Sequence, residues 1–209
     1  MRKSIDQFHI QRTVTKVADD GTAKTGALES YRSERAYVLL GEPGSGKTTA
    51  FEAEAKASGG RFVTARNFVT LENCDIASDT VLFIDALDEL RAIGGDPREL
   101  LDRVRTKLSK YQNVKFRLSC READWLGESD RRAIEALSAN GSMHELRLDP
   151  LTDADVRTFI YAHYPNINLD DFLLNAEENG INQLLYNPQT LHLIAKIVDS
   201  GNWPNSRQS

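Results

Sequence analysis

Between residues 31 and 148, short stretches that contain several apolar residues recur along the chain, and each has the length of a strand. The strands predicted from these runs span residues 36–40, 61–65, 81–85, 114–119 and 144–148. Between the runs, apolar residues recur at three- and four-residue intervals, which is typical of helices packed by one face. The predicted helices span residues 49–57, 99–108 and 131–139. This alternation predicts an α/β fold with a parallel sheet of about five strands, flanked by helices.

The pattern changes at residue 150, after which only helical periodicity remains. Thr152 and Asp155 have the spacing of a capping box, and Asn187 before Pro188 is typical of a helix N-terminus. Four helices are predicted, the third of them short. Residues 1–30 are polar and weakly patterned, with one or two short strands at most. We therefore divide the chain into a polar extension, an α/β core, a small all-helical subdomain and a polar tail, over residues 1–30, 31–149, 150–201 and 202–209.

A complete G-x-x-x-x-G-K-[ST] pattern lies between the predicted strand 36–40 and the predicted helix 49–57. In this setting glycines let backbone N–H groups curl around a phosphate, and the helix N-terminus adds a favourable field. We expect Lys47 to reach the outer phosphates of a nucleotide and Thr48 to ligate Mg²⁺. The residues predicted to bind the nucleotide here are Gly41, Glu42, Pro43, Gly44, Ser45, Gly46, Lys47, Thr48 and Thr49.

The strand over residues 81–85 ends in a carboxylate, and two more follow closely. A carboxylate at the end of a strand beside a phosphate loop can hold Mg²⁺ through water, so Asp85 is the predicted metal residue. Glu89, with Asp88 as the close alternative, is predicted to orient or deprotonate the attacking water. The alternative interpretation is a solvated acidic turn at a helix start, which the helix dipole also favours.

Arg121 follows the strand over residues 114–119. In phosphate-loop ATPases with an additional strand, this strand lies between the strands that carry the loop and the metal aspartate. Arg121 is then directed at the terminal phosphate, where a guanidinium can sense that phosphate or stabilise charge in the transition state. A surface ion pair with Glu122 or Asp124 is the alternative.

The composition of the chain bears on whether nucleic acid or a membrane is expected as a partner. The 209 residues carry a formal net charge of −5, which does not indicate nucleic acid as a partner. No apolar run approaches the ~20 residues needed to span a bilayer, so no membrane is expected. Cys74 and Cys120 are the only cysteines and lack metal-type spacing, which predicts reduced thiols in a cytoplasmic protein.

Several of these motifs resemble those of a known family of ATPases. Residues 85–90, Asp-Ala-Leu-Asp-Glu-Leu, resemble the extended acidic motif of NACHT ATPases, which belong to the STAND class of signal-transduction NTPases. Residues 119–121, Ser-Cys-Arg, match the arginine sensor position of that family. Residues 148–152 resemble the linker into its helical subdomain, and residues 186–191 resemble its Asn-Pro-x-x-Leu element. The resemblance implies that Pro188 lies against the nucleotide base.

The resemblance implies a switch that binds ATP or ADP with Mg²⁺ and hydrolyses ATP slowly. ADP holds a closed monomer, and exchange to ATP permits self-assembly. The family normally continues into a winged-helix domain and a sensor domain, so we expect this chain to be the N-terminal part of a longer protein. In prokaryotes the family is linked to stress signalling and antiviral defence.

Other classes of protein share these motifs. The main alternative is an AAA+-type motor or loader ATPase, which needs an arginine finger from a neighbouring subunit and a ring interface. A small-molecule kinase needs an arginine-rich lid, and none is evident. The Asn-Lys-x-Asp pattern with which GTPases bind their base is absent from the sequence. A nucleotide-stabilised scaffold without useful hydrolysis is the alternative outside the enzymes.

Overall fold

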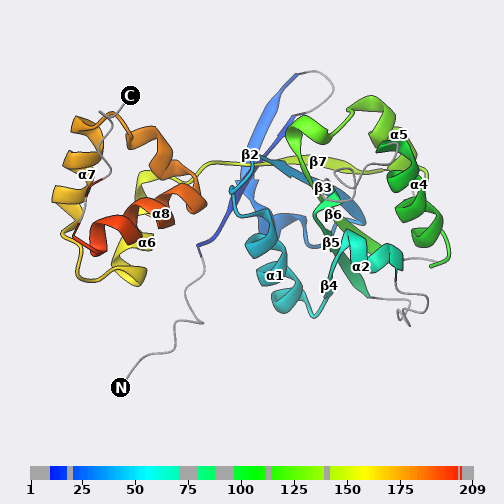
Figure 1. Cartoon of the computed structure of the whole chain (residues 1–209). Coiled ribbons are helices and arrows are strands. Elements are labelled where there is room, and N and C mark those ends of the chain that lie inside the picture. Colours follow the sequence, from blue (N-terminus) through cyan, green and yellow to red (C-terminus); the bar gives the residue numbers. More distant parts are fainter. Residues whose placement is uncertain are drawn as a thin grey trace. The chain divides into compact units, whose positions relative to one another are not determined.

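The computed structural model describes two compact units of the chain. The α/β unit comprises residues 13–43 and 47–149, and the helical unit comprises residues 1–12, 44–46 and 150–209. Figure 1 shows the elements of each. Within them, the structure describes residues 10–17, 21–70, 80–87, 97–111, 114–138, 142–201 and 203.

Seven strands form the sheet of the α/β unit, in the order β2-β1-β7-β3-β6-β5-β4. The five strands from β7 to β4 are parallel, and β1 and β2 extend the sheet in antiparallel pairing. The predicted α/β class is confirmed, but the sheet is larger than the expected five strands. The two additional strands come from the stretch that we assigned to a polar extension. The strands are β1 Thr13–Val17, β2 Ala23–Ala27, β3 Ala36–Gly41, β4 Arg61–Thr64, β5 Val81–Asp85, β6 Lys115–Arg121 and β7 His144–Leu148.

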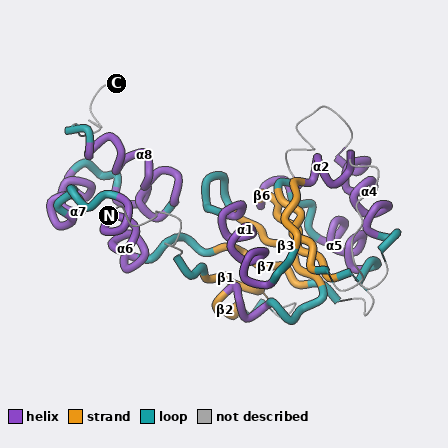
Figure 2. Tube along the Cα trace, turned by 90° about the horizontal axis from the view of Figure 1, so that it is seen from below, coloured by secondary structure: helices purple, strands orange, loops and turns teal. Residues whose placement is uncertain are grey.

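Helices cover both faces of this sheet (Figure 2). Alternate residues of β3 point to opposite faces, as the period of a strand requires. Tyr37 and Leu39 pack with α1 and the short 3-10 helix η2, whereas Val38 and Leu40 pack with α2, α4 and α5. Each face is therefore a separate apolar core. The helical elements of the unit are η2 Leu28–Tyr31, α1 Lys47–Ser58, α2 Ala65–Thr70, α4 Pro97–Leu108, η3 Glu122–Asp124 and α5 Glu128–Glu135.

Several of the predicted site residues lie at the carboxyl ends of the central strands. Strand β3 ends at Gly41, β5 at Asp85 and β6 at Arg121, and Gly41 is paired with Arg121 in the parallel register. Because β6 lies between β3 and β5, the loop after β3 and the carboxylate of β5 flank the end of β6. Ligands of open parallel sheets bind beyond these ends of the strands.

A fully buried arginine fixes the opposite ends of β3 and β6. Arg117 is 1% exposed and stacks on the Tyr37 ring, with its guanidinium carbon 4.5 Å from the ring centroid. Its two terminal nitrogens donate to the backbone carbonyls of Phe116, Arg32, Glu34 and Arg35, over 2.5–3.1 Å. Burial lowers the pKa of this guanidinium from its ordinary value. The side chain thus ties the segment before β3 to β6.

The helical unit contains α6 Asp153–His163, α7 Leu169–Glu178, the 3-10 helix η4 Asn182–Tyr186 and α8 Pro188–Asp199. Thr152 and Asp155 form the capping box of α6, and Asn187 caps α8 with Pro188 at the first helical position. The four elements pack around one apolar core in which Leu191 is fully buried. None of the helices in the described part of the chain combines the length and apolar character of a membrane span.

Candidate functional site

The loop from Gly41 to Thr48 joins β3 to α1 and has the backbone of a phosphate cradle. Gly44 and Gly46 have φ angles of +74° and +90°, which glycine adopts readily and other residues rarely do. Ser45 lies between them and is 8% exposed. Its hydroxyl oxygen is buried and has no hydrogen-bond partner among the described residues. A buried hydroxyl without a partner in such a loop fits an anionic ligand that supplies acceptor oxygens.

Lys47 and Thr48 begin α1 directly after the cradle. The Lys47 ammonium donates to the backbone carbonyls of Gly41 and Glu42, at 2.8 and 3.0 Å. These contacts hold its charge beside the loop backbone, where the sequence places the outer phosphates. The Thr48 hydroxyl donates to Asp85 Oδ2 at 2.8 Å. The two residues predicted to hold Mg²⁺ are therefore in direct contact.

The carboxylate of Asp85 is 3% exposed and accepts hydroxyl donors on both oxygens. Ser119 donates to Oδ1 at 2.5 Å, opposite the contact from Thr48. The same Ser119 oxygen accepts the N–H of Ala86 at 2.8 Å. A carboxylate held this way between a strand end and the first turn of α1 fits a hard cation that prefers oxygen ligands and retains its waters. The metal role of Thr48 and Asp85 stays a prediction.

Other predicted site residues lie nearby or outside the described structure. Arg121 ends β6 with an exposed side chain, beside Gly41 in the sheet. Thr49 lies in the first turn of α1 and is exposed. Asp88 and Glu89, the candidates for the catalytic base, lie outside the described residues. Their predicted role is therefore untested.

Residues 44–46 group with the helical unit, and two residues of that unit donate hydrogen bonds to them. The Gln189 N–H donates to the Gly44 carbonyl at 3.3 Å. Arg12, which is 9% exposed, donates through Nη1 to the Ser45 carbonyl at 2.7 Å. Pro188 Cγ lies 3.6 Å from the point where a Cβ on Gly46 would stand. Pro188 is thus next to the loop backbone, and its predicted contact with a base stays a prediction.

Sequence reasoning missed two residues of this neighbourhood. Ser119 carried a weak signal, because it is a small polar residue between the apolar residues Leu118 and Cys120, two positions before Arg121. Arg12 carried none, since it lies in a polar stretch without periodicity.

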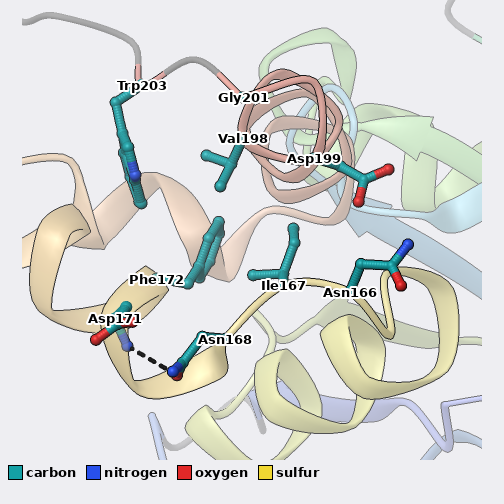
Figure 3. A pocket seen from close by; sticks show the side chains of 9 residues that line it. All are labelled: Asn166, Ile167, Asn168, Asp171, Phe172, Val198, Asp199, Gly201 and Trp203. Atoms are coloured by element: carbon teal, nitrogen blue, oxygen red, sulfur yellow. Dashed lines mark hydrogen bonds between the residues drawn. The ribbon is translucent and has the colours of Figure 1, made fainter.

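A separate depression lies in the helical unit and contains none of the predicted site residues (Figure 3). It has a volume of about 240 Å³, and the rings of Phe172 and Trp203 line it with centroids 5.5 Å apart. Its polar lining comes from exposed side chains of Asn166, Asn168, Asp171 and Asp199. Within the described residues, no group of three or more His, Cys, Asp or Glu side chains is placed to hold a metal ion.

Comparison with known proteins gives distant similarities to ATPases. The chain is 29% identical over 183 residues to the ATP-dependent zinc metalloprotease FtsH of Mycoplasma pneumoniae, which covers 80% of this chain. It is 29% identical over 181 residues to FtsH of Mycoplasma genitalium, which covers 79% of this chain. In both cases the match spans 23% of the relative. No protein-family model matches the chain.

Two solved structures align with most of the chain at low sequence identity. The AAA domain of FIGL-1 in complex with ADP has a TM-score of 0.49 at 12% identity, covering 81% of this chain and 62% of that one. The RuvB Holliday junction branch migration motor of Thermotoga maritima has a TM-score of 0.45 at 17% identity, covering 83% of this chain and 58% of that one. Similarities at this distance do not assign the chain to a family.

Proposed function

We propose that the chain is an ATP-binding module that hydrolyses ATP with Mg²⁺, in the manner of AAA+-type motor or loader ATPases. The observation that carries the proposal is the 2.8 Å hydrogen bond from Thr48 to Asp85, beside a loop in which Gly44 and Gly46 have positive φ angles. This is the arrangement in which a hydroxyl and a strand-end carboxylate share a metal next to a phosphate. The FtsH relatives are ATP-dependent enzymes, which supports ATP as the nucleotide.

Each residue has a chemical task in this proposal. The loop N–H groups and Lys47 bind the phosphate oxygens, and Thr48 with Asp85 holds the hydrated cation. Mg²⁺ neutralises phosphate charge when it is bound. Glu89 accepts the proton of the water that attacks the terminal phosphorus, with Asp88 as the alternative base. Arg121 stabilises the negative charge that develops on the transferred group.

The zinc-dependent proteolysis of the FtsH relatives is not included in the proposal. A metalloprotease helix carries two histidines four residues apart with a glutamate after the first. His144 is followed by Glu145, but residue 148 is a leucine, and His144 lies in strand β7.

The second candidate is the NACHT-type signalling switch that the sequence motifs resemble. The hydrogen bond from the Gln189 N–H to the Gly44 carbonyl supports it, because Gln189 follows the Asn-Pro pair directly. In this candidate the helical unit retains ADP, further domains of a longer chain supply the sensor, and the ATP form self-assembles. Hydrolysis is then slow and resets the switch.

Lys47→Ala tests the nucleotide site that both candidates share. Removing a charged hydrogen bond to phosphate removes about 1.5–3 kcal/mol, so ATP affinity should fall roughly 10- to 100-fold. Titration of ATP by calorimetry measures this fall. The matched control is Lys56→Ala, an exposed lysine in the last turn of the same helix, which should leave ATP affinity unchanged. Undiminished affinity in Lys47→Ala would overturn the site.

Hydrolysis rates distinguish Glu89 from Asp88 as the catalytic base, and the nucleotide retained on purification distinguishes the switch from the motor or loader. Glu89→Gln should keep ATP affinity and slow phosphate release, and Asp88→Asn should have the smaller effect; the reverse order makes Asp88 the base. Near-stoichiometric ADP in the purified protein, identified by mass after denaturation, would favour the switch. An empty protein that binds ATP weakly and reversibly would favour the motor or loader.

A further inference from the structure

Ser119 occupies a position in β6 that neither the phosphate loop nor the acidic motif explains. It is 0% exposed and points to the sheet face covered by α1, because its neighbours Leu118 and Cys120 pack on the other face. A serine on an apolar face normally loses hydrogen bonds to water when it is buried. Here two groups next to the site replace them: the carboxylate of Asp85 and the N–H of Ala86.

We propose that Ser119 is a positioning residue for Mg²⁺-dependent ATP hydrolysis, acting by orienting the Asp85 carboxylate and the turn that follows it. The inference rests on the proposed function, since it assigns the task of Ser119 within that site. Ser119 touches neither nucleotide nor metal in this role; it acts through Asp85.

Three hydrogen bonds join Ser119, Asp85, Ala86 and Thr48. A serine hydroxyl has one proton to donate and lone pairs to accept. Ser119 gives its proton to Asp85 Oδ1 and accepts the Ala86 N–H, while Thr48 donates to Oδ2. The carboxylate is therefore held at both oxygens by hydroxyls from two different elements, β6 and α1. Rotation of the carboxylate breaks at least one of these contacts, so its plane is fixed before a cation arrives.

The second partner of Ser119 is a strained backbone position. Ala86 has φ +59°, and among the described residues no other non-glycine residue has a positive φ. For alanine this conformation costs of order 1 kcal/mol and persists only where neighbours hold it. The hydroxyl of Ser119 holds it through the Ala86 N–H. In sequence, the predicted bases Asp88 and Glu89 follow two and three residues later. One hydroxyl thus links the metal carboxylate to the start of the catalytic segment.

The test compares Ser119→Ala with Ser58→Ala in the whole chain. Ser58 is the control, because it is a serine outside this network whose hydroxyl donates one hydrogen bond, to the Glu54 carbonyl in the last turns of α1. Three quantities are measured: ATP affinity without Mg²⁺, the Mg²⁺ concentration for half-maximal hydrolysis, and the melting temperature. For Ser119→Ala we expect unchanged Mg²⁺-free affinity and a half-maximal Mg²⁺ concentration raised by roughly 10-fold or more, as for other residues that orient metal ligands.

Ala86→Gly added to Ser119→Ala separates positioning from folding. Glycine adopts a positive φ without strain, so the double variant should regain most of the melting temperature lost in Ser119→Ala. Its Mg²⁺ requirement should stay raised, because Asp85 Oδ1 still lacks its donor. A purely structural serine would instead lower the melting temperature while the folded protein kept the wild-type Mg²⁺ requirement and turnover.

The outcomes separate the two proposals. If the wild-type protein and Lys47→Ala bind ATP equally poorly, the proposed function fails and this inference fails with it. If the wild type binds and hydrolyses ATP, and Ser119→Ala shows the same Mg²⁺ dependence and turnover as Ser58→Ala, the positioning role alone is overturned.

Discussion

Replacing Arg117 by methionine removes a guanidinium while keeping an unbranched side chain of similar length in the core. Four backbone carbonyls, those of Arg32, Glu34, Arg35 and Phe116, each lose the guanidinium donor in this variant, and the Arg35 carbonyl keeps the Phe116 N–H. The Tyr37 ring loses a cation on its face but keeps an apolar neighbour. The change therefore targets hydrogen bonding and leaves most of the packing in place.

The expected loss follows from the burial of each partner. The contact with the Phe116 carbonyl is fully buried, and losing a hydrogen bond to a charged donor costs about 1.5–3 kcal/mol. The other three contacts are part-buried, and losing each costs about 0.5–1 kcal/mol because water reaches those carbonyls. Removing the buried charge returns its desolvation cost, the cause of the lowered pKa of Arg117. The net expectation is about 3 kcal/mol, or a melting temperature lower by about 6–12 °C.

Urea unfolding and thermal melting of the whole chain measure this loss. The matched control is Arg132→Met, whose side chain is 76% exposed in an ion pair with Glu128 and should change stability by less than about 0.5 kcal/mol. Arg117→Lys should destabilise at least as much as methionine, because it keeps a buried charge with fewer donors. A loss below about 1 kcal/mol for Arg117→Met, or recovery of wild-type stability by lysine, would refute the reasoning.

Two further substitutions test local backbone geometry. Gly46→Ala places a Cβ 2.9 Å from Arg12 Nη1 at φ +90°, so calorimetry should show ATP affinity at least about 10-fold weaker. The control is Gly59→Ala, at φ +65° with open space around it, which should bind ATP normally. Equal ATP affinities of the two variants would show that Gly46 is not part of the phosphate cradle. Thr152→Ala breaks the capping box of α6 and should lower the unfolding free energy by about 1 kcal/mol in urea. Thr158→Ala, which removes a hydroxyl from within α6, is its control, and an equal effect of the two would show that the cap contributes nothing.

The sequence predicted the elements whose patterns are governed by local rules. Strands β3 and β5 are nearly continuous apolar runs, since both of their faces are buried, and helices α6 and α8 begin at the recognisable caps Thr152 and Asn187. The sequence allows one or two short strands within residues 1–30 but gives no bounds for β1 and β2, because few of their residues are buried. In β1 only Val14 is buried, so their residues lack an apolar run.

The site was predictable where a motif fixes the chemistry and unpredictable where tertiary pairing does. Lys47, Thr48 and Asp85 follow from spacing along the chain, and the structure brings Thr48 and Asp85 into contact. Ser119 reaches Asp85 only because β6 enters the sheet beside β5, which no local pattern specifies. The burial of Arg117 could not be predicted either, since charged side chains usually face water. Its guanidinium is buried because it donates to carbonyls of a segment 82 to 85 residues earlier in the chain.

The position of β6 has a consequence for the order in which the protein is made. Strands β3 and β5 are synthesised first, yet neither pairs with the other; each pairs with β6. A nascent chain that ends before residue 115 therefore has a phosphate loop and an Asp85 carboxylate on strands without a common neighbour. The ribosome exit tunnel delays the remaining strands further, and such non-local pairing is slow. The Asp85 carboxylate acquires its serine partner only when β6 has emerged, so the Asp85–Ser119 contact forms only after residue 119 has left the tunnel.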